Sequence, residues 1–272
     1  MIFYITGDTH GSLSRFKHYD YDMKTNKDLG IVLLGDAGFN FFLDARDAAL
    51  KNAFMNRYQF TLYIVRGNHE ARPQTIPTMK LVYDPEVDGE VYYEQDYPRI
   101  KYFKDFGIYT LNGYRALVIG GAYSVDKWYR LMNNSPWFAD EILSETERQE
   151  CFKMCEGQKF DVVLTHTCPV QWEPTDLFLS GIDQEEVDKT MEIFLEQVRH
   201  AIDYRVWLFG HYHQDRLERP YVEMFFTDTA KLKDIMRRWD DYDKEGDLPW
   251  YYMKSPNYWM GNDKIYKEYG IE

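Results

Sequence analysis

The chain has 272 residues, 45 of them acidic and 32 basic, and its formal net charge of −13 argues against bulk nucleic acid as a partner, because neutralisation of phosphates supplies most non-specific affinity. No stretch approaches the roughly 20 apolar residues of a membrane span, and the start of the chain has no signal-like apolar segment. Three cysteines, an odd number, favour a reducing compartment, so we predict a soluble cytoplasmic protein that does not bind membranes.

The first part of the chain alternates between strand-like and helix-like patterns. Short apolar runs at residues 2–5, 31–34 and 62–65 predict buried strands. Apolar residues at helical spacing predict a short helix over 13–19 and a longer one over 43–58. The resulting order is β-α-β-α-β, which is typical of parallel strands joined by helical crossovers.

The middle of the chain changes to shorter runs. Apolar runs at 107–111 and 114–119 flank Asn112-Gly113, and Asn-Gly between two such runs is the strongest short hairpin signal. Segment 82–102 is rich in Tyr, Asp, Glu and Pro, which predicts a solvated loop that could form part of a substrate rim. The hairpin adds antiparallel strands, so we predict a mixed sheet.

Two more helices are predicted before two more strands. The helices cover 144–156 and 184–202, and Ser144 followed three residues later by Glu147 fits a capping box at the start of the first. Each helix leads into a short apolar run that predicts a strand. The second half of the chain therefore repeats the helix-to-strand pattern of the first.

The chain ends with a predicted hairpin and a tail. Residues 216–219 and 221–226 predict the hairpin, and the charged, aromatic tail predicts a helix and an irregular packing arm. No internal repeat or low-complexity linker is visible. We therefore predict one domain over 1–272, with its core motifs in 7–213 and the packing arm over about 229–272.

Side chains that can bind metal follow five of the predicted strands directly, in the blocks GDTH, GDAG, RGNHE, THT and GHYH. Five of the seven histidines lie in these blocks, which scattered core histidines would not do. Strand ends at one edge of a sheet with helical crossovers converge on a single crevice. The predicted crevice holds Asp8, His10, Asp36, Asn68, His69, His166, His211 and His213.

The residue types in these blocks favour a pair of divalent cations. Carboxylate together with imidazole suits a borderline metal such as Mn, Fe or Zn. Asp36 has two oxygens and can bridge two cations, and the other side chains are numerous enough to complete both coordination sets. Two ions roughly 3.5 to 4 Å apart can clamp a phosphoryl group and deprotonate a water, so the set suits phosphoester hydrolysis better than peptide or redox chemistry.

The blocks GDTHG, GD, GNHE, TH and GHYH, in this order over residues 7–213, resemble the signature of the calcineurin-like metallophosphoesterase superfamily, and of its bacterial and phage members in particular. The resemblance implies an α/β fold. In that fold two mixed sheets face each other and helices flank them, which makes a four-layer α/β/β/α sandwich.

The resemblance also implies a role for each side chain. His69 stays off the metals and acts as general acid, or as a stabiliser of charge, at the leaving-group oxygen, while a hydroxide between the metals is the nucleophile. Manganese is the metal we expect to serve best in vitro. The implied first metal is held by Asp8, His10, Asp36 and His213, and the second by Asp36, Asn68, His166 and His211.

One part of the second block departs from the nearest branch of the superfamily. GDTHG and RGNHE are similar to the protein serine/threonine phosphatase and dinucleoside tetraphosphatase branch, in which GD is followed, after a variable pair, by Asp-Arg. That pair provides a carboxylate for the catalytic histidine and an arginine for phosphate. Here Phe39 and Asn40 occupy these positions, so both groups must come from elsewhere.

Proximity in sequence suggests replacements for the missing pair. Glu70 is the expected carboxylate partner of the catalytic histidine. Arg72 is the preferred phosphate contact, ahead of Arg66 and Arg46, because a guanidinium is a planar fork that matches phosphate oxygens in pairs. A surface salt bridge is the alternative role for Arg72.

A further block, GGAYSVDKWYR at 120–130, resembles a stretch in bacterial and phage relatives of the superfamily. Ser124, Asp126 and Lys127 could line the rim of the site. The alternative is a turn followed by a helix start, with the neighbouring aromatic residues packed in the core.

These patterns leave three functions open. The leading one is dinuclear metal-dependent hydrolysis of a phosphorylated small molecule, a nucleotide or a phosphoprotein. A phosphodiesterase or nuclease is the second, although the sequence contains no basic run to build a groove. A non-catalytic metal-binding interaction module is the third, and it is disfavoured because all eight motif positions hold suitable residues.

Overall fold

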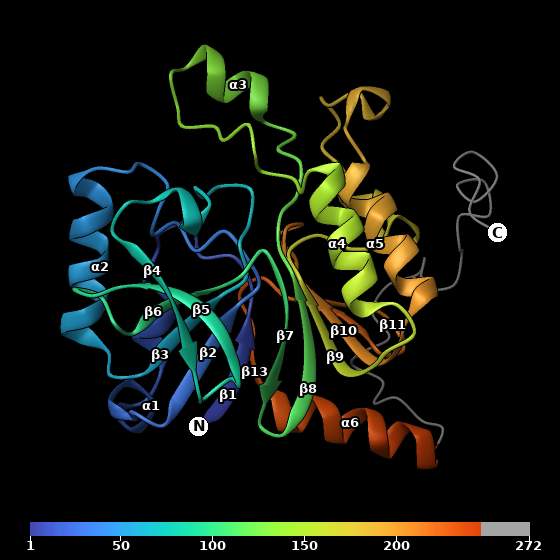
Figure 1. Ribbon diagram of the computed structural model, residues 1–272, viewed down its shortest axis with the longest axis horizontal. Coiled ribbons are helices and arrows are strands. Elements are labelled where there is room, and N and C mark those ends of the chain that lie inside the picture. Colours follow the sequence, from blue (N-terminus) through green and yellow to red (C-terminus); the bar gives the residue numbers. More distant parts are fainter. Residues whose placement is uncertain (246–272) are drawn as a thin grey trace.

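Two mixed β-sheets face each other in the computed structural model, which describes residues 1–245 (Figure 1). The first sheet has seven strands in the order β13-β1-β2-β3-β6-β5-β4. Strands β1, β2, β3 and β6 are parallel to one another, and the other three are antiparallel to their neighbours. The strands are β1 (Ile2–Thr6), β2 (Leu29–Leu33), β3 (Thr61–Ile64), β4 (Met79–Asp84), β5 (Gly89–Glu94), β6 (Ile100–Phe103) and β13 (Thr229–Lys231).

The second sheet has six strands in the order β11-β12-β10-β9-β8-β7. Strands β12, β10, β9 and β8 are parallel, and β7 and β11 are antiparallel strands at the two edges. The strands are β7 (Phe106–Leu111), β8 (Tyr114–Ile119), β9 (Lys159–Thr165), β10 (Asp203–Phe209), β11 (Arg216–Arg219) and β12 (Val222–Met224).

Helices cover the outer faces of both sheets. Helix α2 lies outside the first sheet, and α4 and α5 lie outside the second (Figure 1). The α-helices are α1 (Tyr21–Thr25), α2 (Ala45–Arg57), α3 (Lys127–Met132), α4 (Glu145–Cys155), α5 (Thr190–Ala201) and α6 (Leu232–Glu245). The order of layers is helix, sheet, sheet, helix, which confirms the predicted four-layer sandwich.

The two-residue period of the strands divides the apolar core into layers. In β10, Val206 and Leu208 pack between the two sheets, while Trp207 and Phe209 face α4 and α5 on the other side. A third apolar cluster lies between the first sheet and α2, which contributes Phe54. Strands that are apolar on both faces are what a sheet covered on both sides requires.

Several sequence-based predictions are confirmed. The hairpin of β7 and β8 turns at Asn112 and Gly113, which have φ angles of 53° and 81°, as a type I′ turn needs. The capping box of α4 is present between Ser144 and Glu147. The predicted final hairpin is β11 and β12.

The prediction of a solvated loop over 82–102 was wrong. This segment includes β5, half of β4 and most of β6, which extend the first sheet to its edge. Strand β4 is an edge strand of the first sheet, and five of its six residues are at least partly exposed to solvent. This exposure hid the strand signal, although tyrosine and valine favour strands.

Three helix predictions needed adjustment. The predicted helix over 13–19 is a 3₁₀ turn at Arg15–His18 followed by α1. The predicted helix over 184–202 begins as a separate 3₁₀ turn at Gln184–Glu186, and α5 itself starts at Thr190. The predicted tail helix is α6, but the strand before it, β13, was missed because three residues carry no periodic signal.

Helix α6 closes the end of the sandwich opposite α3 (Figure 1). Its residues Leu232, Ile235, Met236 and Trp239 belong to the apolar cluster between the sheets. The remainder of the predicted packing arm, 246–272, lies outside the described residues. Within residues 1–245, every helix falls short of the length and apolar character that crossing a bilayer needs.

The buried Trp207 offers a test of the core. It is 0% exposed, and its indole N–H donates a 2.9 Å hydrogen bond to Thr165 Oγ1. We expect Trp207→Ala to lower the free energy of unfolding by about 3–5 kcal/mol, because it removes a large buried ring. Urea denaturation measures this change. Trp128→Ala, at a position that is 64% exposed, is the matched control and should change stability by less than about 0.5 kcal/mol.

Candidate active site

All of the predicted metal-binding side chains lie at one edge of the two sheets. The blocks that carry them follow parallel strands of each sheet, and the strands end toward the upper edge in Figure 1. The side chains are Asp8 and His10 after β1, Asp36 after β2, Asn68 and His69 after β3, His166 after β9, and His211 and His213 after β10. The structure therefore brings the eight residues together.

Asp8, His10 and His213 form the more exposed part of this cluster. His213 Nε2 lies 3.3 Å from Asp8 Oδ2, and His10 Nε2 lies 3.9 Å from the same oxygen. The two imidazole Nε2 atoms approach to 2.8 Å. Three potential ligand atoms thus point at a common centre.

Asp36, Asn68 and His166 form the buried part. His166 Nε2 lies 3.5 Å from Asp36 Oδ1 and 2.8 Å from Asn68 Oδ1. The opposite ring nitrogen, Nδ1, is 2.7 Å from the carbonyl oxygen of Leu34. A carbonyl can only accept, so Nδ1 carries a hydrogen and donates it. This hydrogen bond directs Nε2 toward the oxygens of the cluster, as in metal-ligating histidines.

Asp36 connects the two parts. Its Oδ2 lies 4.0 Å from His10 Nε2, while its Oδ1 faces His166. Among the described residues, three groups have all their potential ligand atoms within 4.8 Å of one another. These groups are Asp8 with His10 and His213, His10 with Asp36 and His69, and Asp8 with Asp36 and His166.

His211 and His69 lie beside the cluster in different ways. The ring of His211 is 4.9 Å from that of His166, and its backbone N–H donates to both oxygens of Asp8 at 3.2 Å. His211 is not a member of the three groups found among residues 1–245. The ring of His69 is 5.1 Å from that of His10, and its backbone N–H donates to Asp36 Oδ1 at 2.8 Å.

The backbone of the cluster is strained. His10, Asp36, His211 and His213 have φ angles of 45°, 45°, 70° and 55°, a region that non-glycine residues rarely adopt. Strain of this kind gathers at functional sites, where the surrounding structure holds it in place. The sheets supply the rigid frame here.

Two glycines allow the carboxylates to come close to the neighbouring backbone. A Cβ atom at Gly67 would collide with the Asp36 carboxylate, and one at Gly210 would collide with that of Asp8. The glycines in GNHE and GHYH are therefore required by space. This requirement explains why a small residue precedes the polar side chains in these blocks.

Burial and charge set the protonation states in the cluster. Burial raises the pKa of Asp36, but the imidazoles of His166 and His69 outweigh it and hold the pKa well below its usual range. Burial lowers the pKa of His166, whereas Asp36 and Asp8 together raise it to about 9. Burial and the charge of His166 lower the pKa of His211 to about 3. At neutral pH the centre thus holds ionised Asp36 beside protonated His166, and a cation that bound there would displace the proton from His166.

A chain of hydrogen bonds orients the amide of Asn68. Glu141 accepts from the hydroxyl of Ser124 at 2.5 Å and from its backbone N–H at 3.0 Å. Because that hydroxyl donates to the carboxylate, its oxygen accepts from Asn68 Nδ2, at 2.9 Å. Asn68 Oδ1 must then face His166. Ser124, which the sequence offered either as a rim residue or as part of a turn before a helix, is buried and lies in the turn before α3.

The structure places Glu70 away from the role we expected. Its carboxylate is buried and accepts a 2.7 Å hydrogen bond from the backbone N–H of Gly38. Burial and the charge of Asp36 raise its pKa to about 8. The carboxylate nearest to the ring of His69 is Asp126, whose Oδ1 is 3.8 Å from Nε2. Proximity in sequence suggested Glu70, whereas Asp126 comes from the start of α3, far from His69 in the chain.

Arg72 is not placed for the predicted phosphate contact. Its Nε donates to the carbonyl of Asp140 at 2.8 Å, Nη2 donates to that of Ile142 at 2.7 Å, and Nη1 pairs with Glu147. Nη1 also lies 3.1 Å from Asp105. The guanidinium is thus engaged on all three nitrogens, and a buried salt bridge describes it better than a substrate contact.

Arg66 and Arg46 differ from each other. Arg66 is buried and pairs with Asp105, and it donates to the carbonyl of Glu141 at 2.8 Å. Arg46 is exposed, pairs with Asp44 at 2.6 Å and lies 3.6 Å above the ring of Phe42. Of the three arginines that the sequence suggested, Arg46 alone lines a cavity beside the cluster.

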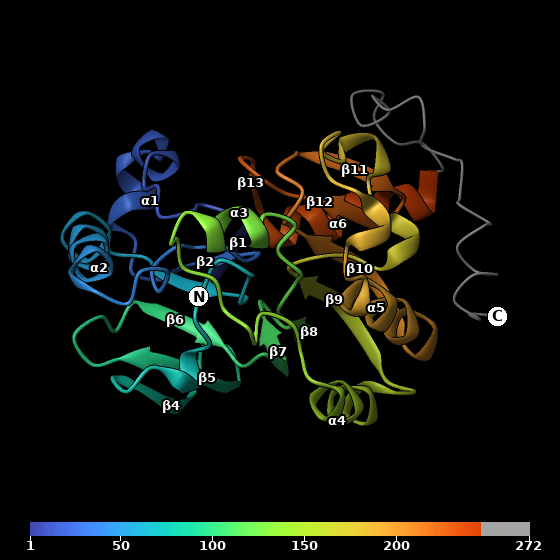
Figure 2. The same cartoon turned by 90° about the horizontal axis from the view of Figure 1, so that it is seen from above.

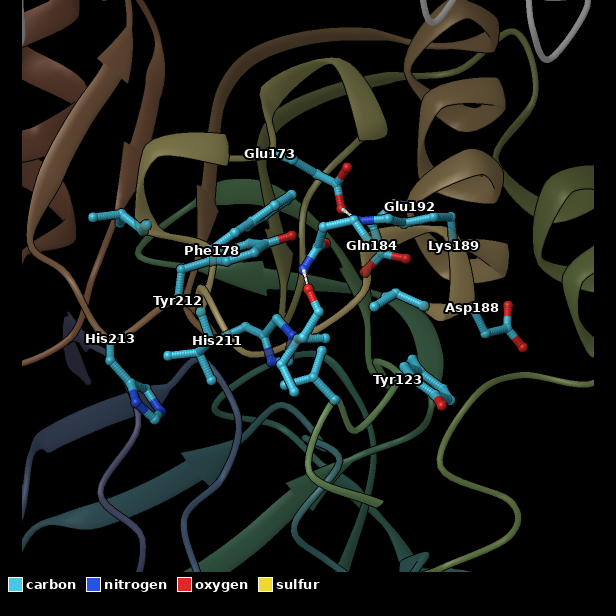
Figure 3. Close-up of a pocket in the computed structure, with 15 residues that line it drawn as sticks. Tyr123, Glu173, Phe178, Gln184, Asp188, Lys189, Glu192, His211, Tyr212 and His213 are labelled. Atoms are coloured by element: carbon cyan, nitrogen blue, oxygen red, sulfur yellow. Dashed lines mark hydrogen bonds and ion pairs between the residues drawn. The ribbon is translucent and has the colours of Figure 1, made fainter. Parts of the chain in front are cut away.

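Two cavities adjoin the cluster. The one beside His10 and His69 has a volume of about 400 Å³ and is also lined by Phe41, Phe42 and Arg46. The other, of about 190 Å³, adjoins His211 and His213. Figure 3 shows this second cavity, with Phe178 and Tyr212 beside the histidines and Glu173, Lys189 and Glu192 at its far end. No residue lines both cavities.

The sequence did not identify the roles of two residues near His69, Asp126 and Arg130. Asp126 was expected only as a rim residue, and Arg130 was not singled out. Asp126 Oδ2 lies 3.2 Å from Arg130 Nε, and the two residues are one helical turn apart at the start of α3. The signal that could have found them is this i, i+4 spacing of opposite charges.

Two facing sheets with carboxylates and imidazoles gathered at the strand ends form a candidate metal-binding site. The model of the calcineurin-like phosphoesterase family matches residues 1–215, and the chain belongs to this family. The resemblance inferred from the five blocks is thereby confirmed.

No curated protein matches the chain. Among solved structures, the phosphopantetheinyl hydrolase from Mycobacterium tuberculosis is similar, with 12% sequence identity and a TM-score of 0.41, covering 96% of this chain and 98% of that one.

The orientation of Asn68 can be tested at Ser124. We expect Ser124→Ala to weaken Mn²⁺ binding by about 10- to 100-fold, because the amide loses the partner that aims its oxygen at the cluster. Calorimetric titration with MnCl₂ measures the affinity. Ser180→Ala, at an exposed position, is the control, and equal affinities in the two variants would contradict the role.

Proposed function

We propose that this protein hydrolyses phosphate esters with the help of two divalent cations. The proposal is carried by one observation, the convergence of two buried carboxylates and the motif histidines on one edge of the sandwich. When bound, the cations would supply charge stabilisation and an activated water. The substrate classes that fit are phosphorylated small molecules, nucleotides and phosphoproteins.

The division of ligands follows the two parts of the cluster. Asp8, His10 and His213 would hold one cation, and Asn68, His166 and His211 the other, with Asp36 shared between them. The position of Asp36 supports this division, because its two oxygens face His10 and His166 separately. Manganese, iron and zinc all accept such a mixture of oxygen and nitrogen.

His69 would hold the proton that the leaving group receives. Its ring stacks on Phe41 at 5.9 Å between centroids, and it lines the larger cavity. Burial and the charge of Arg130 lower the pKa of His69, and the carboxylates of Asp36 and Asp126 offset only part of this shift. Asp126 Oδ1 lies toward Nε2 and favours the protonated ring that a general acid needs.

The role of His69 gives a direct prediction. We expect manganese-dependent hydrolysis of p-nitrophenyl phosphate, and a loss of about 10²- to 10⁴-fold in kcat on His69→Ala. Manganese content, measured by atomic absorption, should persist in the variant. His18→Ala, an exposed histidine outside the blocks, is the matched control. Unchanged turnover would defeat the role, and loss of a manganese equivalent would make His69 a ligand.

The same measurements address the non-catalytic alternative. An interaction module would show no turnover of any aryl phosphate at saturating manganese. Failure of the wild-type chain to bind two manganese equivalents would favour that alternative over the proposed function.

A phosphodiester is the second candidate substrate, and the smaller cavity favours it. The cavity lies beside His211 and His213, and the ring of His10 lies between those of His69 and His213, at 5.1 Å and 4.8 Å. A leaving group beside His69 would be away from this cavity. A second alcohol on the same phosphorus could occupy it.

Glu192 indicates the chemical character of the alcohol that stays bound to phosphorus when the leaving group departs. The side chain is buried, its Oε1 accepts from Thr167 at 2.7 Å, and its Oε2 has no hydrogen-bond partner among the described residues. Lys189 pairs with Glu173 at 2.6 Å and already lies 4.6 Å above the ring of Phe178, which disfavours a cationic group. A neutral, hydroxyl-bearing group such as a ribose would donate to Glu192.

Two substrates with one leaving group test this candidate. If the cavity binds the retained alcohol, thymidine 5′-(p-nitrophenyl phosphate) should have a higher kcat/KM than p-nitrophenyl ethyl phosphate. Burial raises the pKa of Glu192 to about 7, so at a pH well above this value Glu192→Gln should reduce the ratio of the two values by about tenfold, because a charged hydrogen-bond acceptor is lost. The exposed Glu185→Gln serves as control. A ratio near one in the wild type would exclude this role for the cavity.

A further inference from the structure

Arg130 is buried, and most of its hydrogen-bonding capacity is unused. Its side chain is 3% exposed, and Nε lies 3.2 Å from Asp126 Oδ2. Nη1 and Nη2 have no hydrogen-bond partner within residues 1–245. Buried donors on a charged group are costly when they are left unpaired. An arginine in this state is suited to an anionic ligand.

The position of Arg130 connects it to the proposed general acid. Its guanidinium carbon is 5.7 Å from the ring centre of Phe41, and that ring stacks on His69. Asp126 contacts both neighbours, with Oδ1 3.8 Å from His69 Nε2 and Oδ2 toward Arg130. Helix α3 stands above the carboxyl ends of the strands (Figures 1 and 2). Through Asp126 and Phe41, Arg130 therefore lies on the His69 side of the cluster.

The positions that hold the Asp-Arg pair in the related branch have structural roles in this chain. Phe39 is fully buried in the apolar cluster beneath α2. Asn40 is buried, and its carbonyl accepts a 3.0 Å hydrogen bond from the N–H of Ala71. Neither residue offers a charge to a substrate.

We propose that Arg130 binds the non-bridging oxygens of the phosphoryl group and that Asp126 positions both this arginine and His69. The proposal rests on the proposed phosphoesterase function and names its anion-binding residue. Helix α3 thus supplies the carboxylate and the arginine that the second sequence block lacks.

The chemistry of the guanidinium fits this role. Its two terminal nitrogens form a planar fork that can donate to two oxygens of one phosphoryl group at once. The site is shielded from water around Arg130, which strengthens a charge-assisted contact. Asp126 engages Nε, and both terminal nitrogens are buried without a hydrogen-bond partner among residues 1–245, so a phosphoryl oxygen that reached them would satisfy them. No covalent step involves either residue.

The binding step can be tested without turnover. Calorimetric titration of the manganese-loaded protein with inorganic phosphate gives the affinity of the site. We expect Arg130→Met to weaken phosphate binding by about 10- to 100-fold, with Arg130→Lys intermediate because it keeps the charge and loses the fork. Arg57→Met, on the exposed end of α2, is the matched control and should bind as the wild type does.

A second variant separates the two roles. Asp126→Asn should lower kcat for p-nitrophenyl phosphate more than it weakens inhibition by phosphate, whereas Arg130→Met should raise the phosphate inhibition constant. Urea denaturation and manganese content checked in each variant identify a loss that comes from misfolding. Arg130→Lys then serves as the milder probe.

The outcomes distinguish this proposal from the proposed function. Wild-type hydrolysis together with wild-type phosphate affinity in both Arg130 variants would overturn the role of Arg130 and leave the phosphoesterase standing. Phosphate binding that depends on Arg130 without hydrolysis of any ester would support the anion site and contradict the phosphoesterase.

Discussion

Two ionised carboxylates buried at the junction of two sheets are the feature on which the rest of this site depends. Asp8 and Asp36 are each about 1% exposed, and a buried charge without compensation would destabilise the fold. Compensation comes from the backbone N–H groups of His211 and His69 and from the surrounding imidazoles. The two carboxylates can be so close only because parallel strands end at the same edge. The same arrangement that stabilises the charges also prepares a set of ligands for cations.

The close approach of the carboxylates and imidazoles strains the backbone around them, and the packed sandwich stabilises this strained arrangement. Four residues of the cluster adopt left-handed backbone conformations, and two glycines are needed so that carboxylates fit against neighbouring chain segments. Apolar layers on both faces of both sheets provide the rigidity that keeps such conformations populated. The sheets and their outer helices supply stability, and the loops at one edge supply chemistry.

The two sides of the cluster are not equivalent. Beside His69 the cavity is lined by phenylalanine rings and Arg46, and Asp126 at the start of α3 lies next to the His69 ring and pairs with Arg130. Beside His211 the cavity has aromatic walls and a buried carboxyl group, Glu192. Both surroundings come from segments between the strands that carry the ligands. In a fold that serves many substrates, such segments decide which ester is bound, while the cluster decides that an ester is hydrolysed.

The sequence by itself determined the fold class, the order of the site-bearing strands and the group of side chains that could hold metal, because each depends on patterns a few residues long. Strand runs, the Asn112-Gly113 turn and the Ser144 capping box are local signals of this kind. Only the tertiary structure decided the partners of the charged residues. Arg72 is engaged by Glu147, 75 positions away, and His69 has Asp126 rather than Glu70 beside its ring. The three residues of β13 were likewise decided by pairing with β1 at the other end of the chain. The strands over 82–102 pair with neighbours in the sequence, and they were missed because most of the β4 side chains are exposed. Interactions between segments far apart in the chain leave no periodic trace in either segment, so they become visible only when the fold places the segments together.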